Sequence, residues 1–188
     1  MEEKKYRLMK NDTIVRDGRT LYRIQALRDV AIDVRSCTQG GYVESEANLS
    51  HEGRCWLYHD ACAYEDARVE GDALMKLDAT LRGKAKLIEK ACLWNHAIVQ
   101  GEATVGGESF LSDHVVVGGS AILKGNVVLC DDVHVGGNAY LEGDDAHHEL
   151  MIEGTTMILG NTMMYGNGHF PEKEAILEAG SFRIGGDD

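Results

Sequence analysis

A six-residue period that runs without a gap over residues 53–142 limits what this chain can fold into more than any other feature. The ninety residues divide into fifteen units, among them GDALMK, NHAIVQ and DHVVVG. The third place of a unit is mostly Ala, and the fifth is Val, Leu or Met in every unit except the one that contains Ala63. Because these two places are two residues apart, an extended strand points both side chains to the same face. The period therefore predicts short strands that bury their third and fifth places.

The first two places of a unit hold mostly Gly, Asp, Asn, Glu, His or Lys. Gly and Asn supply the positive φ that a sharp corner needs. Three such units make one triangular coil of eighteen residues, which is the hexapeptide β-helix. We therefore predict an all-β, single-stranded parallel β-helix over residues 39–170, with about seven coils that rise about 4.8 Å each. The period slips at residues 143–149, where we expect a bulge or loop.

The two ends of the chain have a different pattern from the repeat. Residues 1–38 contain alternating segments around turn signals at Asn11-Asp12 and Asp17-Gly18, which predict a small N-terminal antiparallel β cap. Residues 171–188 begin with Pro171, continue with acidic residues and reach Gly180. Proline at a helix start, early acids and a later glycine predict a short C-terminal helix.

Composition narrows the environment and the partners. No apolar run approaches the length of about eighteen residues that a membrane helix needs, and the first ten residues lack the apolar core of a signal peptide. Five cysteines without a CxxC pair favour free thiols in a reducing compartment, so we expect a cytoplasmic protein. A net charge of −12 disfavours nucleic acid and anionic membranes as partners.

Residues eighteen apart lie one above the other in a regular coil, so the sequence can be read as vertical columns. One outward column is apolar and consists of Trp56, Leu74, Cys92, Phe110 and Val128. Trp94 lies in the column beside it. An exposed apolar stripe of this length indicates a covering surface. We expect it to form the interface of a homo-oligomer; a cover from the chain's own ends and a groove for a small-molecule ligand are the alternatives.

Two further sets of residues could carry chemistry. His96 and His114 share a corner column with Asp132, and the pair could act as an acid–base group or simply be a polar corner. We predict no metal site, although two stacked imidazoles could in principle hold a divalent ion, and so could the 147–149 cluster. Five cations gather on one wall and its corners, where they could bind the phosphates of a cofactor or be solvated: Arg68, Arg82, Lys84, Lys86 and Lys90.

The segments GRTLYRIQALRDV (18–30) and GGYVESEANLSHEGRCWLY (40–58) resemble the opening of the YdcK-like hexapeptide-repeat proteins, which are often carried by prophages and labelled acetyltransferases. The resemblance implies a left-handed β-helix, an acyltransferase with acetyl-coenzyme A as donor, a histidine base, and the trimers that hexapeptide acyltransferases form. The chain departs from that family in its degenerate units, and it has no long insertion beside an acceptor site. The alternative is a non-catalytic β-helix that serves as a structural or binding module, in a phage or prophage setting.

Overall fold

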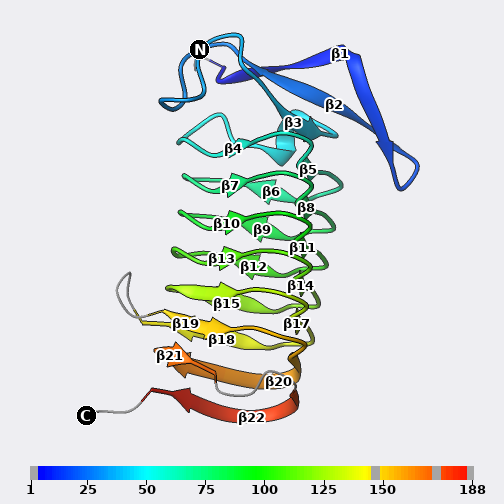
Figure 1. The fold of residues 1–188 in the computed structure, drawn as a ribbon. Helices are drawn as coiled ribbons and strands as arrows, with labels where there is room; N and C mark the ends of the chain where they lie inside the picture. Colours follow the sequence, from blue (N-terminus) through cyan, green and yellow to red (C-terminus); the bar gives the residue numbers. More distant parts are fainter. Residues whose placement is uncertain (1–3, 145–148, 171–174, 186–188) are drawn as a thin grey trace.

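A computed structural model describes residues 4–144, 149–170 and 175–185 (Figure 1). Its described part is all-β apart from a single short 3₁₀ helix, η1 (Glu46–Asn48). Strands that belong to successive coils pair in parallel, and the coils stack into a column with the two termini at opposite ends. This parallel β-solenoid is the predicted fold, and it is consistent with a left-handed β-helix.

The solenoid has three walls, which we name after their first two-residue strands. The β4 wall consists of β4 (Trp56–Leu57), β7 (Leu74–Met75), β10 (Cys92–Leu93), β13 (Phe110–Leu111), β16 (Val127–Leu129), β19 (Leu150–Ile152) and β21 (Gly168–His169). The β5 wall consists of β3 (Gln39–Val43), β5 (Cys62–Ala63), β8 (Thr80–Leu81), β11 (Ile98–Val99), β14 (Val116–Val117), β17 (His134–Val135) and the start of β20 (Met157–Gly166). The β6 wall consists of β6 (Arg68–Val69), β9 (Lys86–Leu87), β12 (Thr104–Val105), β15 (Ile122–Lys124), β18 (Tyr140–Gly143) and the end of β20.

The register confirms the vertical columns. On the β4 wall, Trp56 pairs with Leu74, Leu74 with Cys92, Cys92 with Phe110 and Phe110 with Val128, each eighteen residues apart. Below these coils Val127 pairs with Leu150, so the spacing increases to 23 residues. The additional five residues coincide with the predicted slip at 143–149, of which 145–148 lie outside the described residues.

The third and fifth places of the units fill the interior of the prism, as predicted. Alanines such as Ala79, Ala97 and Ala121 and aliphatic residues such as Leu81 and Val99 are fully buried. Small third places bring the walls close together near the corners, while larger fifth places fill the centre. Burial of each aliphatic side chain contributes about 1.5–3 kcal/mol, so the repeat is explained by the stability of its core.

Backbone conformation repeats with the same period. The first place of every unit from Gly53 to Gly137 has a positive φ, and this place includes non-glycine residues such as Leu77 (φ 60°). At Gly101 (φ 72°) a Cβ would lie 2.7 Å from the carbonyl oxygen of Gly119 in the coil below. The corners therefore impose both a left-handed conformation and a close approach between coils.

The predicted N-terminal cap is present. Strands β1 (Tyr6–Arg16) and β2 (Arg19–Ala26) form an antiparallel hairpin, and β2 also pairs with β3, the first strand of the solenoid. Tyr6 and Ile24 are fully buried against the first coil. Figure 1 shows this hairpin at the N-terminal end of the column, from which it extends to one side.

The predicted C-terminal helix is wrong. Residues Ile176–Ile184 form strand β22, which pairs in parallel with β20 and adds an eighth rung to the β5 wall. Leu177, Phe182 and Ile184 pack against the core from this strand. The local preference for a helix is outweighed because β20 offers unpaired backbone groups and an open apolar interior. A strand pairs with the first and covers the second. Residues 171–174, which include Pro171, lie outside the described residues.

Two substitutions at the first place of a unit, one to glycine and one from glycine, test whether the corners require a left-handed conformation and a close approach between coils. Leu77→Gly should stabilise the fold by about 1 kcal/mol, or about 2–4 °C in Tm, because it removes the cost of a left-handed leucine. Gly101→Ala should destabilise it by more than about 1 kcal/mol, because its new Cβ meets the coil below. Thermal unfolding followed by circular dichroism measures both changes, and two shifts of the same sign would contradict the argument.

Candidate functional site

The predicted histidine pair is formed at the corner between the β4 and β5 walls. The rings of His96 and His114 stack with centroids 5.4 Å apart and an interplanar angle of 10°. His96 Nδ1 lies 3.9 Å from Asp78 Oδ2, and His114 Nδ1 lies 3.6 Å from Asp132 Oδ1. The carboxylates therefore bracket the two imidazoles from the coils above and below.

Both imidazoles face solvent in the single chain. The side chain of His96 is 60% exposed and that of His114 is 67% exposed. Neither residue lines the three recesses formed by residues 144–185, 31–90 and 45–68 in the described part of the chain. A general base acts on a substrate that is held within hydrogen-bond reach, and one chain alone offers these histidines no such enclosure.

The described side chains do not form a recognisable metal site. Among the described residues, no group of three or more His, Cys, Asp or Glu side chains is arranged to hold an ion. The possible cluster at residues 147–149 lies mostly outside the described residues.

The five predicted cofactor-binding cations do not converge on one recess. Arg68 and Lys86 are neighbours on the β6 wall, Lys84 and Lys90 occupy different corners, and Arg82 lies on the β5 wall. Four of them have a carboxylate nearby. Lys84 contacts Glu102 at 2.9 Å, Lys90 contacts Glu108 at 2.5 Å, Arg82 contacts Asp17 at 2.8 Å, and Arg68 lies 4.0 Å from Glu70.

This pairing follows from the columns themselves. Lys84 and Glu102 are eighteen residues apart, as are Lys90 and Glu108, so each carboxylate lies directly beneath its cation. The carboxylates raise the pKa of both lysines through hydrogen bonds and charge. Only Lys86 lacks an ion-pair partner among the described residues. A cofactor phosphate would therefore have to displace existing partners at most of these positions.

The apolar stripe of the β4 wall is present but shorter than predicted. Leu74, Cys92, Phe110 and Val128 are half-buried and lie in one column. Trp94 lies beside them, with its ring 6.0 Å from that of Phe110 in an edge-to-face arrangement.

Trp56 does not belong to this exposed stripe, and its prediction as an interface residue is wrong. Its side chain is fully buried, and the Tyr6 ring of the cap lies 6.4 Å from it in an edge-to-face contact. The cap therefore covers the first position of the column within the chain. The sequence shows the column but not where the N-terminal hairpin folds over it.

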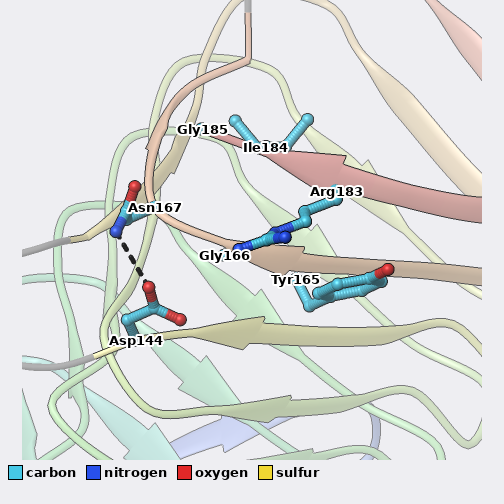
Figure 2. Close-up of a pocket in the computed structure, with 7 residues that line it drawn as sticks. All are labelled: Asp144, Tyr165, Gly166, Asn167, Arg183, Ile184 and Gly185. Carbon is cyan, nitrogen blue, oxygen red and sulfur yellow. Dashed lines mark hydrogen bonds between the residues drawn. The ribbon is translucent and has the colours of Figure 1, made fainter. Parts of the chain in front are cut away.

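A recess at the C-terminal end was not predicted from the sequence (Figure 2). It has a volume of about 260 Å³ and is lined by residues from the ends of successive coils, among them Asp144, Tyr165, Asn167 and Arg183. Asn167 Nδ2 donates to Asp144 Oδ2 at 2.8 Å, and Tyr165 lies opposite Arg183 in the register of β20 and β22. Its floor contains Gly166 and Gly185, and none of the predicted site residues lies in it.

A second unpredicted recess lies at the other end of the solenoid. The loop between β2 and β3 and the first coils of the β4 wall line an open recess of about 390 Å³. Lys76 and Tyr58 line this recess. Of the predicted cofactor-binding residues, Lys90 alone lines it. The column that contains Tyr58, Lys76 and Trp94 was visible in the sequence, whereas the position of the loop was not.

Comparison with protein-family models gave no match, and neither did comparison with curated protein sequences. In the described part of the chain, no helix is long and apolar enough to cross a membrane. The fold and the side-chain geometry are therefore the grounds on which a function can be proposed.

The cysteines provide a test of the described packing. Burial raises the pKa of the Cys55 thiol, which lies in the core, and of the Cys62 thiol, which lies under the N-terminal cap, whereas Cys37 is exposed. Because the thiolate is the reactive form, iodoacetamide at pH 8 should modify Cys37 in the folded protein and leave Cys55 and Cys62 intact until denaturant is added. Peptide mass spectrometry reports each site. Equal labelling of all three in the folded state would contradict the packing of the first coil.

Proposed function

We propose that this chain is a non-catalytic β-helix module that assembles with copies of itself through the β4 wall. The observation that supports the proposal is the half-exposed column from Leu74 to Val128, extended by Trp94 and by Met151, which pairs with Val128. A contiguous apolar stripe on a water-facing wall is typical of a protein–protein contact. Aromatic residues such as Trp94 and Phe110 are the side chains most enriched in such contacts.

The distribution of charge also favours the β4 wall as the contact between copies. The chain has 31 acidic residues and a net charge of −12, so most surfaces of two copies would repel each other. The outward fourth and sixth places of the β4 wall contain no carboxylate from Trp56 to Cys130, and those of the β5 wall contain none from Cys62 to Gly136. Two copies can therefore approach through these walls with little repulsion. We favour a trimer, because a three-sided prism can present one wall to each of two neighbours.

The enzyme hypothesis has less support from the single chain. Its proposed base would be His96 or His114, and both are exposed outside any described recess. Its proposed donor site would use cations that already have partners. A cytoplasmic location and a phage or prophage setting remain part of the proposal, the first supported by five free thiols and the second by the sequence resemblance alone.

One observation nevertheless favours an acyltransferase as a second candidate. The stacked histidines lie on the corner that joins the β4 and β5 walls. Assembly through these two walls would bring a neighbouring subunit to the imidazoles and could enclose a substrate there. In that case His114, bracketed by Asp132, would act as the base, and acetyl-coenzyme A would be the donor.

A charge placed in the stripe tests the assembly. Phe110→Asp should shift the protein from an oligomer to a monomer, because the new carboxylate would be buried without a partner. Ile122→Asp is the matched control, since Ile122 occupies the same place of its unit on the β6 wall and is exposed. Sedimentation-equilibrium centrifugation measures the mass. A wild-type monomer, or equal effects of the two substitutions, would contradict the proposal.

Acetyl-coenzyme A distinguishes the two candidate functions. A specific donor at about a hundred times its Kd should add about 2.7 kcal/mol to the free energy of unfolding of an acyltransferase. The non-catalytic module should show no stabilisation by this donor in a thermal-shift assay. The enzyme would be the better explanation if the donor stabilised both the wild type and His114→Ala, and if only the wild type transferred acetyl groups to small amines. That result would contradict our proposal.

A further inference from the structure

The recess beneath the N-terminal loop has the features of a binding site that neither candidate function requires. It lies between the loop that connects β2 to β3 and the first coils of the β4 wall. Leu74 contributes apolar surface from the wall, and Ala31 contributes apolar surface from the loop. A volume of about 390 Å³ is within the range of small-molecule sites.

A hydrogen bond fixes the loop over the wall. Tyr58 Oη donates to Asp33 Oδ1 at 3.2 Å. Burial, together with the charge of Asp33, raises the pKa of Tyr58 to about 12, so the phenol keeps its proton at neutral pH. Ala31 and Val34 also exchange backbone hydrogen bonds, which gives the loop a defined turn. The recess is thus bounded by held segments on both sides.

The recess contains an ammonium that no carboxylate of the described residues neutralises through an ion pair. Three cations and two carboxylates line it, in a chain whose net charge is −12. Two of the cations are neutralised: Arg54 contacts Asp72 at 2.5 Å, and Lys90 contacts Glu108 at 2.5 Å. The third cation, Lys76, has no carboxylate partner in the described part of the chain.

Aromatic rings hold the ammonium of Lys76 in place. Its Nζ lies 5.1 Å from the centre of the Tyr58 ring and 4.8 Å from the centre of the Trp94 ring. Such cation–π contacts orient an ammonium but leave its hydrogen-bond donors available for an anion. Next to this ammonium lies the apolar side chain of Leu74.

We propose that this recess binds a small organic carboxylate, with the carboxylate on Lys76 and an apolar body between Leu74 and Ala31. An ammonium without an ion-pair partner beside apolar surface selects a ligand that has both a negative charge and an apolar body, and inorganic anions lack the apolar body. Every residue of the recess comes from one chain, so the site does not need the proposed assembly. Leu74 also belongs to the apolar stripe proposed for assembly, so binding is measured on both the wild type and the monomeric variant expected from Phe110→Asp.

Cyclohexanecarboxylate is a suitable probe, and cyclohexanecarboxamide is its uncharged counterpart of the same shape. Neither absorbs near 280 nm, so tryptophan fluorescence can follow the titration through Trp94. The carboxylate should give a saturable change, and the carboxamide should bind at least about tenfold more weakly, because it lacks the charge-assisted hydrogen bond. This comparison uses the unmodified protein.

Two substitutions complete the test. Lys76→Met should weaken carboxylate binding at least about tenfold. Lys124→Met is the matched control, because Lys124 also lies over an aromatic ring, that of Tyr140 at 5.8 Å, but on the β6 wall away from the recess. Lys124→Met should therefore keep the wild-type affinity.

Three results would overturn the inference: no saturable change with the carboxylate in either the wild type or the Phe110→Asp variant, equal affinity for carboxylate and carboxamide, or equal affinity of the two lysine variants. The monomeric variant expected from Phe110→Asp should still bind the probe, since its recess is intact. Binding by a wild type that is monomeric would therefore refute the proposed function alone, and an assembled wild type together with a Phe110→Asp variant that does not bind would refute this inference alone.

Discussion

The vertical backbone hydrogen bonds between coils are the interaction on which this structure depends. Thr80 N donates to Ala97 O at 2.9 Å, Ile98 N to Val115 O at 2.8 Å, and Val116 N to Val133 O at 3.0 Å. Each bond requires that the chain return to the same wall after eighteen residues, and the positive-φ corners make that return possible. Side chains of equal place must then stack, whatever their chemistry.

Stacking explains the polar surface as well as the core. Arg54 lies above Asp72, Lys84 above Glu102, and Lys90 above Glu108, so opposite charges in one column neutralise each other. The same geometry places His96 on His114 and Asn95 on Asp113. Exposed ion pairs of this kind contribute little free energy each, but they remove the free cations that a phosphate-binding site would need. Lys76 differs because aromatic rings, and not carboxylates, lie above and below it.

At the two ends of the solenoid, a terminal coil has no neighbouring coil to pair with its backbone and cover its interior. At the N-terminal end, Tyr6 and Trp56 close the interior, and the buried Lys5 donates from Nζ to the carbonyl oxygens of Cys55 at 2.8 Å and Glu52 at 3.2 Å. Burial lowers the pKa of Lys5, because removal from water disfavours its charged form. At the C-terminal end, β22 covers the last rung with a strand. The recess that contains Lys76 and the one that contains Arg183 lie at these two ends, where irregular segments meet regular coils.

By itself, the sequence determined the β-helix, its inward places and its vertical columns, because a six-residue period with glycine-rich corners has few other solutions. It thereby placed His96 over His114 and aligned Leu74, Cys92, Phe110 and Val128. Only the tertiary structure decided what the ends of the chain do. It showed that the cap buries Trp56, that residues 176–184 extend the sheet as a strand, and that the β2–β3 loop forms a recess with Lys76. The reason is that a repeat carries its own register within each unit, whereas a cap or a loop finds its position through contacts with coils that are distant in the sequence.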